Sequence, residues 1–183
     1  IKVHYLSFIQ QVHRDLEESG IDPVKWEIRS LPIVKSTNDY VERLFISNFN
    51  QNIVLSQTQD HGRGRKSSFW ESEVGGIYLS LGLQSPRSVI ELSTPVVKAV
   101  HEVLSKYVKC DIKDPNDILI EGKKVSGILV ESKTSGNIMN QVIIGVGINV
   151  INDIAPSIAS IATRLSEHCD PPEIPILASE VAV

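Results

Sequence analysis

The sequence is poor in cysteine. Cys110 and Cys169 are its only two cysteines among 183 residues, and they lie far apart in the chain. Two cysteines can form one disulfide but no disulfide framework, and without clustered histidines they do not favour a structural zinc site. This cysteine usage is typical of a reduced, cytoplasmic protein.

Long apolar runs and an excess of basic charge are also missing. No run approaches the ~20 residues that a membrane helix needs, and the chain, which begins at Ile1, opens with no basic-then-apolar signal segment. The 18 Lys and Arg residues are outnumbered by 22 Asp and Glu residues, which gives a formal net charge of −4. This balance argues against a protein that covers DNA or RNA with a basic surface, but it does not argue against a local anion-binding site. We therefore expect no membrane partner and no DNA partner.

Several common catalytic and nucleotide-binding motifs are absent. The chain has no P-loop, no Gly-x-Ser-x-Gly elbow and no pair of histidines at metal-ligand spacing. Gly145-Val146-Gly147 lacks the third glycine of a dinucleotide-binding fingerprint, and no clear helix follows it. The chemistry of this protein must therefore be sought in less common patterns.

Hydrophobic periodicity predicts both helices and strands. Apolar residues at helical spacing predict helices over residues 5–16 and 40–45, the second preceded by the capping sequence Ser36-Thr37-Asn38-Asp39. A third helix is predicted to start at Thr94, with Pro95 at its first helical position. Strands are predicted at residues 25–30, 52–57, 76–83, 118–120, 125–131 and 138–146.

The order of these elements favours an α+β fold with a mixed central β-sheet flanked by helices over a doubly wound sheet. Turn residues at 121–123 and 134–137 predict adjacent hairpins among the later strands. Weak helices are predicted near residues 157–167 and 175–183. The length indicates a single domain over residues 1–183.

The most informative segment is a polar loop over residues 58–72. Its centre, Gln59-Asp60-His61-Gly62-Arg63-Gly64-Arg65-Lys66, places three cations within four residues and spaces them with glycine. Glycine lets the backbone approach a ligand closely, and arginine can bind a carboxylate or phosphate through two parallel hydrogen bonds. The pattern is compatible with a loop that folds over an anion, and also with a solvated basic turn.

The turn Lys113-Asp114-Pro115-Asn116-Asp117 stands just before a predicted strand. The oxygens of Asn116 and Asp117 suit Mg²⁺ or the polar edge of a ligand, although the same residues also make an ordinary turn.

Glycines inside two predicted strands form the remaining pattern. Gly127 follows Lys124 within one strand, and strand glycine marks either close approach of a ligand or a β-bulge. Gly145 and Gly147 alternate in the next strand, ahead of Asn149, and leave one sheet face bare for a helix or for a ligand.

Taken together and in this order, these segments resemble the catalytic domain of biotin protein ligases, the biotin–[acetyl-CoA-carboxylase] ligases. The matching pieces are Ser36-Thr37-Asn38, Gln59 with Gly62-Arg63-Gly64-Arg65, Trp70, Lys113 with Pro115-Asn116-Asp117, Lys124 with Gly127-Ile128-Leu129-Val130-Glu131, and Gly145 with Gly147-Ile148-Asn149. The family-like core runs over residues 36–150. The resemblance implies the biotin/lipoate ligase fold, which is similar to class II synthetases.

The resemblance also implies an activity and its substrates. The family joins biotin to ATP, giving biotinyl-5′-AMP and pyrophosphate, and then passes biotin to a lysine of a biotin carboxyl carrier protein domain. It therefore implies biotin, ATP and Mg²⁺ as ligands of this chain and the carrier domain as its partner.

Roles for individual residues follow from the same resemblance. The implied catalytic residues are Lys124, Arg65 and Asp117. The implied biotin-binding residues are Ser36, Thr37, Asn38, Gln59, Gly62, Arg63, Gly64, Gly127 and Ile128. The implied nucleotide-binding residues are Arg65, Lys66, Trp70, Asn116, Lys124 and Asn149, with Asn116 and Asp117 as tentative Mg²⁺ ligands.

Two positions depart from the family pattern. Ser67-Ser68 stands where the family usually has Gly-Arg, which removes a cation and a flexible joint from the loop. Asp114 stands where the family usually has Trp, which removes apolar surface and adds negative charge near an anion site. We expect both changes to weaken the binding of biotin or ATP.

The flanks of the core and the choice of substrate leave alternatives open. The stretch before Ser36 is too short for the DNA-binding winged helix of repressor-type ligases, and the small C-terminal β domain is absent or cut off at Val183. Pairing through sheet edges is frequent in the family, which leaves a homodimer open. A lipoate or octanoate ligase or transferase of the same fold, or a non-catalytic biotin-binding relative, remain alternatives.

Overall fold

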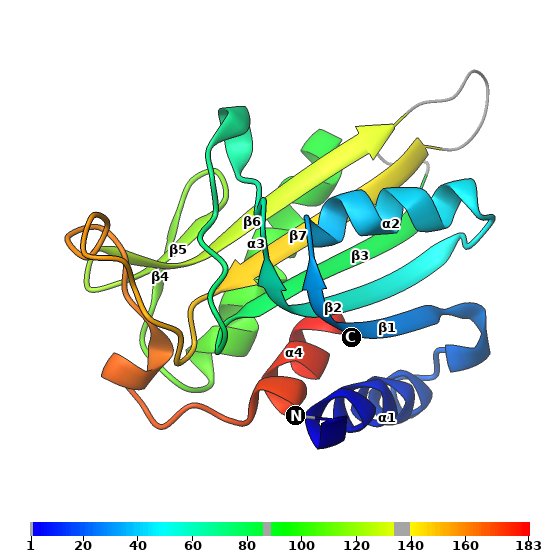
Figure 1. The fold of residues 1–183 in the computed structure, drawn as a ribbon, viewed down its shortest axis with the longest axis horizontal. Coiled ribbons are helices and arrows are strands. Elements are labelled where there is room, and N and C mark those ends of the chain that lie inside the picture. Colours follow the sequence, from blue (N-terminus) through cyan, green and yellow to red (C-terminus); the bar gives the residue numbers. More distant parts are fainter. Residues whose placement is uncertain (1, 86–88, 134–139) are drawn as a thin grey trace.

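Seven strands form one mixed sheet in the computed structural model, which describes residues 2–85, 89–133 and 140–183 (Figure 1). The strands are β1 Glu27–Val34, β2 Gln51–Gln59, β3 Ile77–Ser85, β4 Asp111–Lys113, β5 Asp117–Ile120, β6 Lys123–Lys133 and β7 Asn140–Ile148. Their order in the sheet is β1-β2-β3-β7-β6-β5-β4. β1 pairs with β2 in parallel and every other neighbouring pair is antiparallel, so the predicted mixed sheet is confirmed.

Four α-helices cover the two faces of this sheet unequally. They are α1 Lys2–Glu18, α2 Thr37–Ile46, α3 Val89–Ser105 and α4 Ile174–Ala182. Apolar residues of α1, α3 and α4 join the larger core cluster, whereas α2 packs in a smaller cluster with β2 and β7. Figure 1 shows α2 lying across the strands, with α1 and α4 along the lower side of the molecule. The predicted α+β architecture is confirmed.

Alternation along the central strands explains why the two faces differ. In β3, Ile77 and Leu79 join the larger core, while Ser80 and Gly82 point to the α2 side. A Cβ added to Gly82 would lie 2.3 Å from Val41 Cγ1, so α2 approaches the backbone too closely for any larger residue. The α2 face therefore combines small and polar residues, as a binding surface requires, and the other face supplies the apolar core.

Two sequence-based predictions of secondary structure are wrong. The third helix begins at Val89, and Pro95 lies inside it rather than at its start. Leu92, one turn before the proline, packs against the core, and this burial extends the helix in spite of the missing N–H.

The weak helix predicted near residues 157–167 is replaced by turns and a short 3₁₀ segment, Leu165–Glu167. The chain here pairs with the start of β6 instead: Lys124 N–H donates to the Ile161 carbonyl, and Thr163 N–H donates to the Lys124 carbonyl. Tertiary pairing outweighs a weak local helical preference at this position.

The short edge strand β4, Asp111–Lys113, was not predicted, and the other strands and helices agree with the sequence pattern with shifted ends. The strand predicted at 25–30 continues through Pro32, which β1 tolerates because it lies at an edge of the sheet. The predicted turn at 134–137 and the first two residues of the strand at 138–146 lie outside the described residues. Cys110 and Cys169 are both free. No helix in the described part of the chain is long and apolar enough to cross a membrane.

Candidate active site

A cavity of about 300 Å³ lies on the α2 face of the sheet, beside the glycine-rich loop. The start of α2, the loop, and parts of β3, β6 and β7 form its walls. All the sequence-predicted site residues except two line it: Ser36, Thr37, Asn38, Gln59, Arg63, Gly64, Arg65, Lys66, Trp70, Asn116, Asp117, Lys124, Gly127 and Ile128. The fold thus collects residues from five separate segments around one space.

The two exceptions lie next to this cavity. Gly62 lines a second space of about 790 Å³ on the other side of the loop, which also borders Arg63 and Arg65. A Cβ on Gly62 would lie 2.3 Å from the Trp70 carbonyl oxygen, so the loop can close on itself only with glycine there. The Asn149 side chain is buried and donates from Nδ2 to the Thr163 carbonyl at 3.0 Å.

The polar end of the cavity is built where α2 begins. Ser36 caps the helix, its Oγ accepting from Asp39 N–H at 3.5 Å. Thr37 donates from its N–H at 2.8 Å and from Oγ1 at 3.1 Å to Gln59 Oε1. Gln59 Nε2 in turn donates to Ser72 Oγ at 2.9 Å. Ser72 carried no sequence signal that separated it from other loop serines.

Asn38 lies flat on the sheet because β7 has a glycine beneath it. A Cβ on Gly145 would lie 2.4 Å from Asn38 Oδ1, so the bare face expected from the alternating glycines receives this helix residue. Ser80 Oγ lies within hydrogen-bond distance of both Asn38 Oδ1, at 2.6 Å, and Thr37 Oγ1, at 2.7 Å. Asn38 Nδ2 donates to Glu131 Oε2 at 2.7 Å.

Arg63 is held by two carboxylates of the protein itself. Its guanidinium donates to Glu131 through two bonds of 2.8 Å and to Asp39 Oδ1 at 2.8 Å. Burial alone raises the pKa of Glu131, but the hydrogen bonds from Arg63 and Asn38 outweigh it and leave the pKa below its ordinary value. Arg63 therefore ties the loop to α2 and β6, and its predicted contact with biotin stays a prediction.

The opposite end of the cavity is charged. Lys124 Nζ lies 2.7 Å from Asp117 Oδ1 and 5.1 Å from the centre of the Trp70 ring. Arg65 donates to Asn116 Oδ1 at 3.2 Å, and Lys66 is exposed in a left-handed conformation with φ of 52°. These three cations face one space, with a carboxylate paired to one of them.

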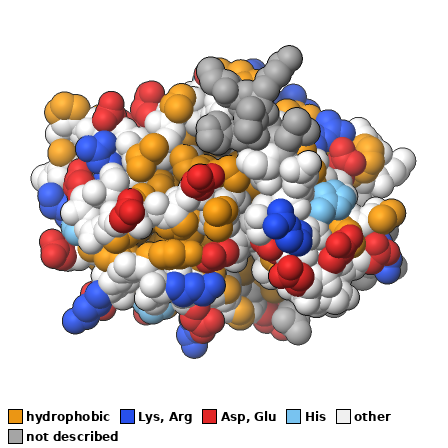
Figure 2. Space-filling view, turned by 90° about the horizontal axis from the view of Figure 1, so that it is seen from below, with side chains coloured by type: hydrophobic (Ala, Val, Ile, Leu, Met, Phe, Trp, Pro, Cys, Tyr) orange, Lys and Arg blue, Asp and Glu red, His pale blue; other side chains and the backbone are white. Residues whose placement is uncertain are grey.

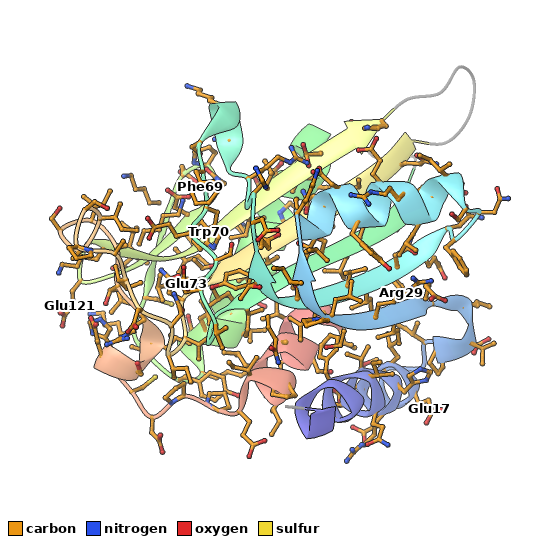
Figure 3. All side chains as sticks on the ribbon, viewed as in Figure 1. Glu17, Arg29, Phe69, Trp70, Glu73 and Glu121 are labelled. Carbon is orange, nitrogen blue, oxygen red and sulfur yellow. The ribbon has the colours of Figure 1, made fainter. Side chains whose placement is uncertain are left out.

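Trp70 covers the bare glycines at this end. A Cβ on Gly147 would lie 2.5 Å from its indole ring, and one on Gly127 would lie 2.9 Å from it. Its buried indole N–H has no hydrogen-bond partner among the described residues. Figure 3 shows Phe69 and Trp70 next to each other in the later part of this loop. An unsatisfied buried donor at the edge of a polar cavity is suited to a ligand acceptor.

The tentative Mg²⁺ ligands, Asn116 and Asp117, are engaged with cationic side chains of the protein in this structure. Asp117 Oδ1 faces Lys124, and Asn116 Oδ1 accepts from Arg65 while its Nδ2 donates to the Ile128 carbonyl. Among the described residues, no three His, Cys, Asp or Glu side chains gather as a protein-held metal would require. The oxygens of both residues are already matched to cations, so their metal role stays a prediction.

Comparison with known proteins matches the part of the chain that contains these site residues. The model of the biotin/lipoate A/B protein ligase family matches residues 30–149. The chain belongs to the biotin/lipoate A/B protein ligase family, which confirms the resemblance found in the sequence.

Individual relatives agree with this assignment. The chain is 39% identical over 126 residues to the bifunctional ligase/repressor BirA of Bacillus subtilis, an alignment that covers 63% of this chain and 38% of that protein. The fold superposes on the biotin protein ligase of Aquifex aeolicus in complex with biotin and ATP with a TM-score of 0.68 and 29% identity, covering 85% of this chain and 68% of that one. The biotin protein ligase of Leishmania major in complex with biotin gives a TM-score of 0.69 at 21% identity, covering 85% and 71%, and supports the fold. The chain spans less than half the length of the curated relatives it matches.

Proposed function

We propose that this chain activates biotin with ATP to give biotinyl-5′-AMP and pyrophosphate, and passes the biotinyl group to a lysine of a biotin carboxyl carrier protein domain. The observation that carries the proposal is the division of one cavity into a neutral polar end and a cationic end. Family membership, and the relative whose structure holds biotin and ATP, support it further.

The two ends of the cavity suit the two parts of biotin, its neutral ring and the carboxylate that is to be activated. Thr37, Asn38 and Gln59 offer amide and hydroxyl groups of the kind that hold the ring of biotin. The carboxylate would then extend toward Lys124 and Arg65. Two anions, the carboxylate and the α-phosphate, must approach each other, and nearby cations lower the cost of that approach.

In the first step a carboxylate oxygen of biotin attacks the α-phosphorus of ATP. A P–O bond to the acyl group forms, the bond to the β-phosphate oxygen breaks, and pyrophosphate leaves with the electron pair. Lys124 is the residue we assign to both anions, since its ammonium, 2.7 Å from Asp117 Oδ1 and 5.1 Å from the centre of the Trp70 ring, belongs to the charged end of the cavity. Arg65 and Lys66 stabilise charge on the phosphates from the loop side.

In the second step the ε-amine of the acceptor lysine attacks the acyl carbon. An amide bond forms, AMP leaves, and one proton is released from the amine; Asp117 is the carboxylate placed to accept it. Magnesium accompanies ATP phosphates and would supply further charge neutralisation. Asn116 and Asp117, which both face cations of the protein, are the residues that would lie near it.

The test is a mass-spectrometric search for the acyl-adenylate. The chain is incubated with Mg·ATP and, in separate tubes, with biotin, lipoate or octanoate. A biotinyl-adenylate peak and pyrophosphate are expected with biotin. Adenylate from lipoate or octanoate instead would move the activity to the other branch of the family. Biotin bound in calorimetry without any adenylate would replace the proposal by a non-catalytic binder.

A further inference from the structure

A continuous set of hydrogen bonds encloses the polar end of the cavity, and we call it the polar circuit. Its members are Gly62, Arg63, Glu131, Asn38, Ser80, Thr37, Gln59, Ser72 and Trp70. It runs from the Arg63 guanidinium through Glu131 to Asn38, then through the Ser80 hydroxyl to Thr37, whose backbone N–H donates to Gln59, and on through Ser72 to the Trp70 carbonyl. Trp70 N–H donates to the Gly62 carbonyl at 2.9 Å, which closes the circuit beside Arg63.

Glu131 joins the two kinds of hydrogen bond in the circuit, because its carboxylate accepts from the cationic Arg63 and from the neutral amide of Asn38. Oε1 accepts from Arg63, and Oε2 accepts from both Arg63 and Asn38, each between 2.7 and 2.8 Å. Bonds between ionised partners are shorter and stronger than neutral ones, and a two-pronged pair also fixes orientation. The side chain is 31% exposed, so these bonds are only partly screened by water.

The position of the loop depends on these bonds more than on packing. Arg63, Arg65 and Lys66 are exposed, and the glycines between and beside them give the backbone wide conformational freedom. The Arg63–Glu131 pair ties the loop to β6, and the Arg63–Asp39 pair ties it to α2. The Gly62–Trp70 backbone bond closes the loop on itself, and Arg65 donates to Asn116. Since Arg65 and Lys66 lie two and three residues after Arg63, the place at which Arg63 is held limits where both cations can lie.

We propose that Glu131 is a positioning residue of this site, which couples the polar end of the cavity to the cationic loop through Asn38 and Arg63. A ligand that binds to Asn38 or Thr37 would thereby affect the position of the loop. Conversely, a loop that is held less firmly would bind that ligand with lower affinity. The kinetic part of this inference rests on the proposed function; the structural part, that Glu131 orders the loop, does not.

The chain offers a matched control. Glu42 of α2 pairs with Lys133 of β6, so it bridges the same helix and strand as the Asn38–Glu131 bond. Glu42 lines none of the cavities beside the loop, and no hydrogen bond joins it to Arg63 or Asn38 among the described residues. Glu42→Gln and Glu131→Gln therefore remove one carboxylate charge each from equivalent surroundings, and only the second breaks the circuit.

Two measurements on the whole chain test the proposal. The first is hydrogen exchange of the loop amides, residues 61–69, without ligands. The second is the biotin KM and kcat of adenylate formation. Glu131→Gln should speed exchange of the loop about tenfold and raise the biotin KM about tenfold, the size expected for a lost charge-assisted bond, with a smaller change in kcat. Glu42→Gln should change neither.

A second variant tests the same ion pair in case Glu131→Gln does not fold. Arg63→Lys keeps the charge and loses the two-pronged geometry, so it should give the same changes at smaller size. The double variant should be no worse than Glu131→Gln alone.

Equal loop exchange in Glu131→Gln and Glu42→Gln would overturn the proposal. Faster loop exchange in Glu131→Gln with an unchanged biotin KM would mean that Glu131 orders the loop without affecting biotin, and this result would also overturn the proposal. If the unmodified chain makes no adenylate with any acid, the proposed function fails. Loop exchange and the calorimetric affinity for biotin then decide the role of Glu131 separately.

Discussion

The two ends of the cavity are built on different principles. At the polar end the groups bind one another: Thr37 and Asn38 are each 4% exposed, and every polar atom named there has a partner within the protein. At the charged end Arg65 and Lys66 are exposed, and Lys124 pairs with the Asp117 carboxylate and lies near the ring of Trp70. One end is already organised before a ligand arrives, while the other holds positive charge that an anion must complete.

This difference matches the two kinds of recognition that acid activation requires. A neutral ring is selected by fixed donors and acceptors, which cost little reorganisation when it binds. Two anions are brought together by mobile cations, which gain most of their interaction only when the anions are present. Each variant below weakens or strengthens mainly one end of the cavity.

The largest effect is expected from Lys124→Met at the charged end. Removal of the ammonium should lower the rate of adenylate formation by about 10²–10³-fold, the usual loss for one group that stabilises developing charge. Biotin affinity should change far less, because the polar end is untouched. Lys123→Met is the matched control, since that lysine is exposed and its Nζ donates to the Ala159 carbonyl away from the cavity. Near-normal turnover in Lys124→Met would remove Lys124 from the chemistry.

Gly145→Ala should disrupt the polar end of the cavity by displacing Asn38. The added Cβ would lie 2.4 Å from Asn38 Oδ1, so the helix residue must shift, and overpacking of this kind costs about 1–3 kcal/mol. We expect Gly145→Ala to lower the melting temperature and to abolish measurable biotin binding in calorimetry. In an Asn38→Ala background the same change should cost no further stability. An additive loss there would show that Asn38 is not what the new methyl group meets.

Restoring the family residues at the two departures should strengthen the charged end by a smaller amount. Ser68 lines the cavity beside Arg65 and Lys66, so Ser68→Arg adds a cation there. Asp114 is exposed and adjoins Pro115 at the second cavity, and Asp114→Trp removes a negative charge. Each should lower the KM for ATP by about two- to fivefold, the range of an exposed charge contact. Steady-state adenylation kinetics would refute this if neither variant improves.

The smallest effect concerns acid. Because the pKa of Glu131 is lowered in the folded chain, the carboxylate stabilises the fold at every pH above its unfolded value, about 4.3. That contribution disappears as pH falls through the lowered folded value. The melting temperature of the unmodified chain should therefore exceed that of Glu131→Gln at neutral pH, and the gap should narrow as acid protonates the Glu131 carboxylate. A gap that stays constant from neutral pH into strong acid would contradict the assignment.

The surface away from the site shows a third kind of organisation. Figure 2, seen from the side of α1 and α4, shows hydrophobic side chains near the centre of the face with charged ones scattered around them. An apolar cavity of about 580 Å³ between the start of α4, the second half of β2 and the segment before β3 includes Cys169 and Ile151. Apolar residues such as Val74, Val150 and Ile174 line it, in contrast to the hydrogen-bonded polar end of the candidate active site.

Local pattern was sufficient for most elements and for the membership of the site. The alternating residues of β3 and β7, the cap at Ser36 and the loop glycines are each fixed by short-range chemistry. The start of α3 and the segment 157–167 were predicted wrongly, because burial of Leu92 and pairing with Lys124 outweigh local preference. Ser72 and Ser80 were missed for a similar reason, and Glu131, although it stands in a matched motif, was given no role.

By itself, the sequence determined which residue types are available: cations on a glycine-rich loop, a lysine at a strand start, and strand glycines that leave room above the sheet. Only the tertiary structure decided which of them bind one another. Asn38 and Glu131 are separated by 93 positions and meet because the register of β3, β7 and β6 places Ser80, Gly145 and Leu129 side by side. Hydrogen bonds require contact within about 3 Å, and at such sequence distances contact is set by sheet register and helix packing.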